Sequence, residues 1–286
     1  LPARLWTVSA GSPWIRILRT AVKQNGGTVI GHAHGIGGGF YKTDHLSLVD
    51  FQACSKFYAY SDDSAKGMAA SLSPKMIFQN SAPKISVFPE MQEGVREGIT
   101  EAFQRSKGSG AKHSKPVKIM HVGGVLTGEN QNFTVLLHGY LQADWYARLW
   151  GKLTGFGFEV VHKPHPDNKR YLTEEFIAGC GAQIEERPFE EVFQEADVIL
   201  FDRPTSTTFA TAMLSDAPAV LMDFGVIDFL PSAQELLIKR CAMVQGQFED
   251  DGRATTDWAQ LQDALQTAHL LSDRTFADKY FSVPVS

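Results

Sequence analysis

The order in which strand-like and helix-like segments follow one another constrains the fold of this sequence most. In the second half, short apolar runs typical of buried strands alternate with segments whose apolar residues recur at helical spacing. The expected strands are 117–122, 158–161, 198–201 and 219–222, and the expected helices are 137–153, 188–196, 205–214, 233–240 and 258–271. Strands and helices that alternate over short connections form parallel βαβ units. The second half is therefore predicted to be a doubly wound α/β domain.

The first half shows the same alternation in a less regular form. A helix is expected over 15–23, and the polar run 61–64 predicts another helix that starts near Ala65, because Ser and Asp side chains cap helix N-termini. The expected strands are 28–30, 57–60, 76–78 and 85–87.

A polar segment separates the two halves. Residues 105–115 are rich in Gly, Ser and Lys and lack apolar periodicity, which is typical of a linker. We therefore expect an amino-terminal α/β domain over 1–112 and a carboxyl-terminal α/β domain over 113–286.

The composition excludes several classes of protein. The chain has 286 residues, of which 43% are hydrophobic and 21% charged, as in an ordinary globular protein. Its net charge of -5 argues against binding to duplex nucleic acid. No apolar run approaches the roughly 20 residues of a membrane-spanning helix. The three cysteines have no paired spacing, which argues against a disulfide framework and favours a reducing, cytoplasmic setting.

Three unusual segments each follow a predicted strand, where ligands bind in parallel sheets. The first holds His32 and His34, whose side chains point the same way if the segment is extended. Either imidazole would serve as a general base near neutral pH, or both would make structural hydrogen bonds. A metal needs a third ligand, and no recognised spacing supplies one, so no metal is predicted.

The second segment presents Lys163 and His165 between prolines, including Pro166. The prolines favour an extended, rigid tip, and both side chains can donate charge-assisted hydrogen bonds to a phosphate or a carboxylate. The alternative is a rigid surface turn with incidental charge.

The third segment runs from Asp202 through Arg203 to four consecutive hydroxyl residues that open a helix, Thr205, Ser206, Thr207 and Thr208. One hydroxyl is enough to cap the helix. The free N–H groups at this helix end also favour phosphate, so we expect a phosphate-binding role. Arg203 would add charge or pair with Asp202.

Two weaker candidates complete the set. Gly123 and Gly124 follow a strand and would let a ligand approach the backbone, but they do not form the fingerprint of a dinucleotide-binding loop. Glu235 would reach a ribose hydroxyl, or it is an ordinary solvated carboxylate.

Taken together, the three segments resemble those of GT-B-type transferases of bacterial surface polysaccharides, in particular the CDP-glycerol glycerophosphotransferases and the CMP-sialic acid and CMP-Kdo capsular transferases. The resemblance spans residues 28–245. His165-Pro166 is similar to the His-Pro motif of these families, and Ser206-Thr207 to their paired hydroxyl motif, both of which hold donor phosphate. His34-Gly35 is similar to the His-Gly that supplies a base in the glycerophosphotransferases.

The resemblance implies a GT-B-like fold with two Rossmann-like, doubly wound parallel-sheet domains. The first is expected to be short or truncated, because strand units before Ile15 are missing and the sequence starts at Leu1 without Met. Asp62-Asp63 lacks the Gly that follows in the acidic motif of the sialyltransferases.

The implied reaction is the transfer of a sugar or polyol phosphate from a nucleotide-activated donor, with a cytidine nucleotide favoured, to a glycan or lipid-linked glycan acceptor. His34, or otherwise His32, would be the base. The remaining candidates would bind the donor: Lys163, His165, Pro166, Asp202, Thr205, Ser206, Thr207, Gly123, Gly124 and Glu235. No metal or other cofactor is required, no nucleic acid is bound, and the chain would be cytoplasmic with peripheral association at the inner membrane.

Two other functions stay open. The same scaffold would suit a sugar-nucleotide epimerase or hydrolase. The short first half favours a non-catalytic glycan-binding module derived from a transferase.

Overall fold

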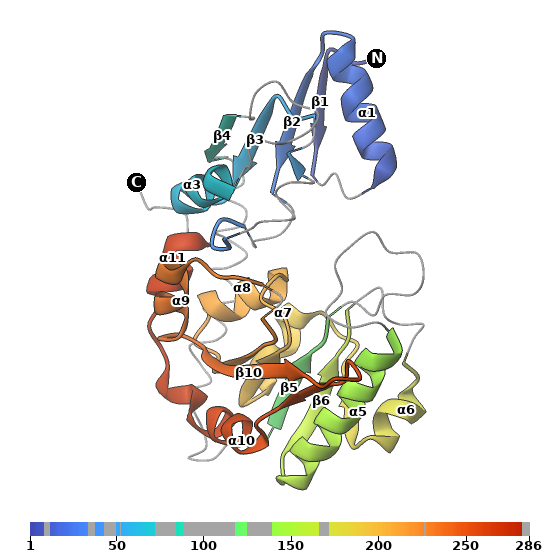
Figure 1. Cartoon of the computed structure of the whole chain (residues 1–286), viewed down its shortest axis with the longest axis vertical. Helices are drawn as coiled ribbons and strands as arrows, with labels where there is room; N and C mark the ends of the chain where they lie inside the picture. The colour runs from blue at the N-terminus through green and yellow to red at the C-terminus, as the bar shows by residue number, and fades with distance from the viewer. Residues whose placement is uncertain are drawn as a thin grey trace.

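The computed structural model describes residues 1–8, 12–33, 38–42, 50–51, 53–71, 84–87, 118–124, 139–165, 172–225 and 227–281. These residues form a four-stranded sheet from the first half of the chain and a seven-stranded sheet from the second half (Figure 1). The predicted strand 76–78, the linker 105–115 and the boundary after residue 112 lie outside the described residues.

The larger sheet has the order β11-β10-β9-β8-β5-β6-β7. Its strands are β5 (Lys118–Val122), β6 (Glu159–Lys163), β7 (Ala182–Ile184), β8 (Val198–Phe201), β9 (Ala219–Asp223), β10 (Ala242–Phe248) and β11 (Ala254–Thr256). All neighbours pair in parallel except β10 and β11, which form an antiparallel pair at the edge. From β5 the chain first winds outward to β6 and β7, and it then returns to β8 on the other side. This reversal is the predicted doubly wound topology.

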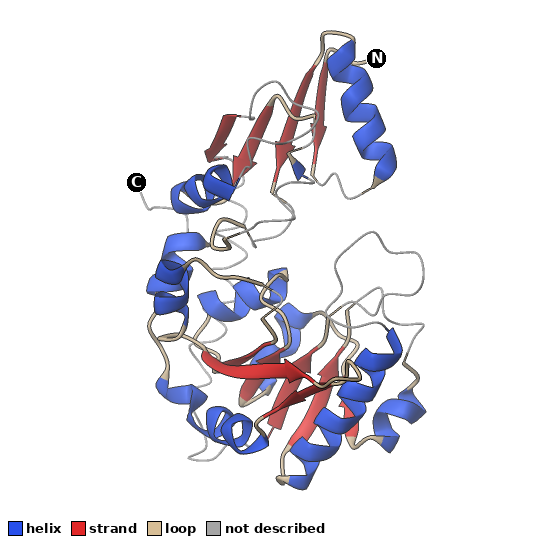
Figure 2. Cartoon of the chain, in the orientation of Figure 1, coloured by secondary structure: helices blue, strands red, loops and turns tan. Residues whose placement is uncertain are grey.

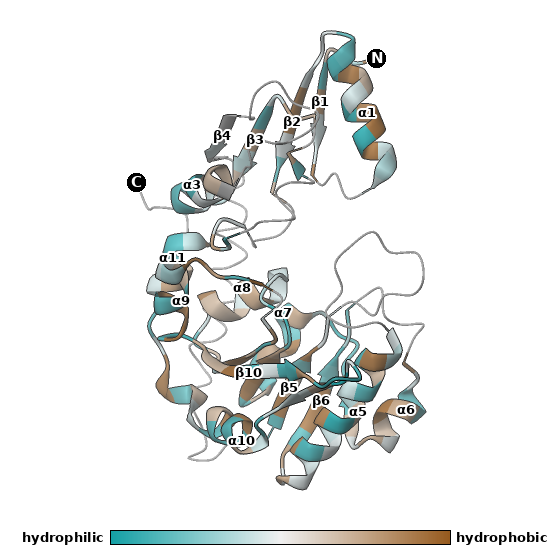
Figure 3. Cartoon of the chain, in the orientation of Figure 1, coloured by the Kyte–Doolittle hydropathy of each residue, from teal (hydrophilic) through white to brown (hydrophobic). Residues whose placement is uncertain are grey.

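Helices cover both faces of this sheet (Figure 2). They are α5 (Gly139–Gly155), α6 (Glu174–Gly179), α7 (Phe189–Val192), α8 (Thr207–Leu214), α9 (Pro231–Leu237), α10 (Trp258–Thr267) and α11 (Thr275–Tyr280), with short 3-10 turns at Phe193–Glu195 and Ala268–Leu270. One core packs α5, α6 and α10 against the face of the sheet that holds Ile119 of β5. The other core packs α7, α8, α9 and α11 against the opposite face, which holds Met120 and Val122. Hydrophilic (teal) and hydrophobic (brown) residues occur on the same helices, as expected for helices with one buried side (Figure 3).

The smaller sheet runs in chain order, β1 (Arg4–Thr7), β2 (Thr28–His32), β3 (Lys56–Ala59) and β4 (Lys84–Val87), and all its pairs are parallel. Helices α1 (Pro13–Gln24) and α3 (Asp62–Ser71) pack against the same core, which includes Val29 and Phe57. The expectation of no strand unit before Ile15 was wrong, because β1 precedes α1. This edge strand is half exposed, so its sequence contains no buried apolar run.

Two segments join the halves. Phe40 packs among Phe229, Phe276 and Tyr280 in the core of the larger sheet. Helix α11 returns from the end of the chain to lie beside α3, where Ser61 Oγ donates to the carbonyl oxygen of Lys279 at 3.0 Å (Figure 1). None of the helices in the described part of the chain is both long and apolar enough to cross a membrane.

Candidate functional site

The strand order of the larger sheet reverses between β5 and β8, and α/β sheets bind ligands beyond the carboxyl ends of the strands at such a reversal. We call this position, beyond the ends of β5 and β8, the crevice. The segments that leave these two strands touch. The backbone N–H of Gly124 donates to Asp202 Oδ2 at 3.4 Å. The Arg203 side chain lies against Gly124, where an added Cβ would fall 2.8 Å from Arg203 Nε. Two of the predicted segments therefore meet at this crevice.

The segment that holds Lys163 and His165 lies at the end of the neighbouring strand β6. Lys163 pairs in register with Val122, and its carbonyl oxygen accepts from the N–H of Gly123 at 3.3 Å. Lys163 Nζ donates to the carbonyl oxygen of Glu185, at the end of β7, at 3.2 Å. His165 is half-buried two residues beyond β6, so it lies at the same sheet edge as the crevice. Pro166 lies outside the described residues.

Helix α8 starts shortly after the end of β8. Ser206 is the N-cap, and its Oγ accepts from the N–H of Phe209 at 3.1 Å. This hydroxyl also shares a 2.7 Å hydrogen bond with Thr208 Oγ1. The Ser206 hydroxyl therefore caps α8. The amides of Thr207 and Thr208 have no hydrogen-bond partner within this helix. Thr205 is half-buried beside them, and Thr207 is exposed.

A buried polar network lies beneath the crevice. Asp202 is 3% exposed, and its Oδ2 accepts from Tyr146 Oη on α5 at 2.9 Å. Gln142 Nε2 donates in turn to Tyr146 Oη at 2.7 Å. On β5, His121 Nδ1 accepts from Trp150 Nε1 at 3.0 Å, and His121 Nε2 lies 3.9 Å from Asp202 Oδ2.

Sequence reasoning missed the α5 and strand members of this network, because Trp145 and Trp150 dominate the helix and are fully buried as expected of core residues. The available signal was a set of polar side chains at i, i+4 spacing within an apolar helix, Gln142 and Tyr146, opposite His121 within a buried strand.

Burial sets the protonation states in this region. It lowers the pKa of His121 to about 3 and the pKa of His162 well below its usual value. It raises the pKa of Asp202, and Arg203 and the hydrogen bond from Tyr146 oppose that rise. The rings of His121 and His162 stack at 5.4 Å, and each is fully buried. Both imidazoles are therefore neutral near pH 7.

This neutral pair predicts a loss of stability in mild acid. The unfolded chain protonates its histidines near pH 6.5, while the buried rings stay neutral, so the free energy of unfolding falls as the pH drops below about 6.5. The expected slope is on the order of 1 kcal/mol per pH unit for each histidine. Urea unfolding at pH 7.5 and pH 5 measures the loss. It should shrink in His162→Leu and persist when the exposed His269 is replaced by Gln. An equal loss in both variants contradicts the assignment.

The amino-terminal candidates lie on the smaller sheet. His32 ends β2, is half-buried and pairs in register with Tyr58, while His34 lies outside the described residues. The Tyr58 ring is parallel to that of Trp6, with centroids 6.1 Å apart, and Tyr58 Oη accepts from Lys56 Nζ at 3.3 Å. Trp6 is 48% exposed. His32 therefore borders an aromatic and cationic surface on the opposite side of the sheet from Phe57 and its core.

Glu235 is exposed on α9, and no described contact joins it to Gly124 or Asp202. Among the residues that the structure describes, no group of three His, Cys, Asp or Glu side chains could hold a metal ion.

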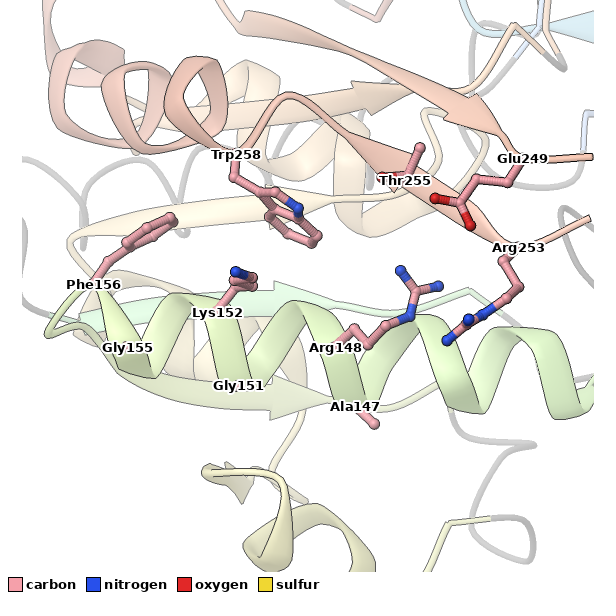
Figure 4. A pocket seen from close by; sticks show the side chains of 10 residues that line it. All are labelled: Ala147, Arg148, Gly151, Lys152, Gly155, Phe156, Glu249, Arg253, Thr255 and Trp258. Carbon is pink, nitrogen blue, oxygen red and sulfur yellow. The ribbon is translucent and has the colours of Figure 1, made fainter.

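A groove of about 650 Å³ runs along α5 between that helix and the β10–β11 end of the sheet (Figure 4). Arg148 and Arg253 on its walls both bind Asp144, at 2.7 and 3.3 Å, which offsets much of their charge. None of the predicted site residues lines this groove. Its lining residues are Ala147, Arg148, Gly151, Lys152, Gly155, Phe156, Glu249, Arg253, Thr255 and Trp258.

Comparison with known proteins identifies the fold. No family model and no curated protein matches the sequence. The UDP-GlcNAc 2-epimerase from Neisseria meningitidis, solved with UDP-GlcNAc bound, has a similar structure, with a TM-score of 0.53 and 9% identity over 98% of this chain and 74% of that one. The wall teichoic acid polymerase TagF matches 98% of this chain and 67% of its own at 13% identity, with a TM-score of 0.44. The first likeness and the two parallel sheets confirm the predicted α/β, GT-B-like architecture.

Proposed function

We propose that the chain is a GT-B-type glycosyltransferase that moves a sugar or polyol phosphate from a nucleotide-activated donor to a glycan acceptor in surface polysaccharide biosynthesis, with a cytidine nucleotide favoured. The observation that carries this proposal is the crevice between β5 and β8, where Gly124, Arg203 and the start of α8 converge. Backbone amides without a helical partner, next to a guanidinium, suit the phosphates of such a donor.

In the proposed reaction, an acceptor hydroxyl attacks the donor, and its proton passes to His34 or His32. The bond between the transferred group and the nucleotide phosphate breaks, and the nucleotide leaves with the negative charge. The α8 amides, Arg203 and His165 would stabilise that charge, an effect worth several kcal/mol in a site that excludes water.

The acceptor would approach from the smaller sheet. His32 borders Trp6 and Tyr58, and such flat rings suit the faces of sugar rings in a glycan. The proposal extends to a cytoplasmic chain in peripheral contact with the inner membrane, because a lipid-linked acceptor would hold it there.

The test of this function is a thermal-shift screen with CMP, CDP-glycerol, CMP-sialic acid and UDP-GlcNAc. At a concentration 100 times its Kd, a bound ligand stabilises the fold by about 2.7 kcal/mol, so the correct nucleotide should raise the Tm by several degrees. His165→Ala should abolish the shift and lower the unliganded Tm only slightly, because His165 is half-buried. No shift with any of the nucleotides would contradict the proposal.

A sugar-nucleotide epimerase is the second candidate, favoured by the structural likeness to the UDP-GlcNAc 2-epimerase. Incubation with UDP-GlcNAc and no acceptor separates the two functions. An epimerase converts the sugar of the nucleotide under these conditions, whereas the transferase leaves it intact. A non-catalytic glycan-binding module would bind glycan and turn over neither substrate.

A further inference from the structure

A chain of hydrogen bonds from Gln142 through Tyr146 ends at one oxygen of Asp202, and a second hydrogen bond, from Trp150 to His121, lies beside it. The chemistry of the members fixes the direction of each bond. An amide Nε2 can only donate, so Tyr146 Oη accepts from Gln142 and gives its own proton to Asp202 Oδ2. An indole N–H can also only donate, so His121 accepts from Trp150 at Nδ1. The proton of neutral His121 then sits on Nε2, the atom that faces Asp202 Oδ2 at 3.9 Å.

The two oxygens of Asp202 therefore have different surroundings. Oδ2 receives hydrogen bonds from Tyr146 Oη and from the N–H of Gly124. Oδ1 is buried and has no hydrogen-bond partner, and neither do Nε and Nη2 of the adjacent Arg203. A buried polar atom without a partner is costly, and a bound ligand is one way to supply the missing partner. One oxygen of the carboxylate is held by hydrogen bonds, and the other has no partner, as is true of two nitrogens of the neighbouring Arg203.

We propose that Tyr146 is a positioning residue, which orients Asp202 so that Oδ1 accepts a hydrogen bond from a hydroxyl or N–H group of the bound nucleotide while Arg203 binds its anionic part. This inference rests on the proposed function, since it deepens the donor site described above. It adds Tyr146, and Gln142 behind it, as residues that act through Asp202 without touching the ligand.

The decisive variant is Tyr146→Phe, which removes one hydroxyl from a fully buried ring. Isothermal titration calorimetry with CDP and with UDP, from pH 4.5 to 7.5, should show affinity reduced about tenfold near pH 7. The acidic limb of binding should also move to higher pH, because Asp202 loses a hydrogen bond that favours its ionised form. The charged and titratable groups that face Asp202 are His121 on β5, Tyr146 on α5 and the neighbouring Arg203.

A second variant separates positioning from stability. Tyr146→Phe leaves Gln142 without its acceptor, so Tyr146→Phe combined with Gln142→Leu should recover Tm while affinity stays reduced. Affinity that returns together with Tm, or that never fell in Tyr146→Phe, overturns the positioning role.

A readout without ligand distinguishes this inference from the proposed function. The carboxyl carbon of Asp202, followed by NMR in the unliganded protein, should titrate at higher pH in Tyr146→Phe than in the unsubstituted chain. A higher titration midpoint supports the network even where neither CDP nor UDP binds, in which case only the proposed function fails. An unchanged midpoint overturns the inference, whatever binds.

Discussion

Replacing Arg240 with alanine should lower the free energy of unfolding by about 3–5 kcal/mol, because it removes the hydrogen bonds that this buried guanidinium donates to carbonyl groups. Arg240 is 1% exposed, and its Nη2 donates to the carbonyl oxygens of Ala212, Ser215 and Ala217 at 2.6, 2.7 and 2.9 Å. Its Nε donates to the carbonyl oxygen of Met213 at 3.2 Å. Ala212 and Met213 belong to the last turn of α8. The last carbonyls of a helix lack partners within the helix, and the helix dipole also favours a cation at this end.

Urea unfolding of Arg240→Ala against Arg187→Ala provides the measurement. Arg187 also makes close polar contacts, to Glu185 at 2.6 Å and Glu195 at 2.9 Å, but its side chain is 52% exposed. An exposed pair of this kind contributes little to stability, so the loss in Arg187→Ala should be much smaller. A loss in Arg240→Ala no larger than in Arg187→Ala would show that the buried carbonyls do not depend on this guanidinium.

Gly123→Ala should cost about 1–3 kcal/mol of stability and weaken nucleotide binding by tenfold or more. An added Cβ would fall 2.7 Å from Tyr146 Oη and 2.8 Å from His162 Cε1. Both side chains are fully buried, so neither can retreat into solvent. Any shift of Tyr146 carries Asp202 with it through their hydrogen bond. Gly123 is therefore required because two buried side chains lie too close to its backbone to leave room for a Cβ.

Gly151→Ala is the matched control, since the same methyl group is added on α5 with no heavy atom within 4 Å. Alanine is preferred over glycine in a helix interior, so the control should gain about 0.5–1 kcal/mol and bind nucleotide normally. Tm and the nucleotide-induced shift, measured for both variants, test the comparison. Two variants that behave alike would rule out crowding at Gly123.

The central elements of the larger sheet could be predicted because their signals are local. All four residues of β8 are apolar and buried, and Ser206 caps α8 a few residues later. The strands β1, β7, β10 and β11 were missed, since each is partly exposed and shows no run of buried apolar residues. Half-exposed edges look like loops in a sequence.

The chain alone identified Gly124, Asp202 and His165 as candidates, because every parallel strand ends at the same sheet edge and these residues follow strands. It could not pair Tyr146 with Asp202, which is 56 residues away and meets it only when α5 packs over β5 and β8. Short-range patterns of side chains determine the order of the strands and the start of each helix. The pairing of a buried hydroxyl with a distant carboxylate depends on how two packed layers align, and only the tertiary structure decides that alignment.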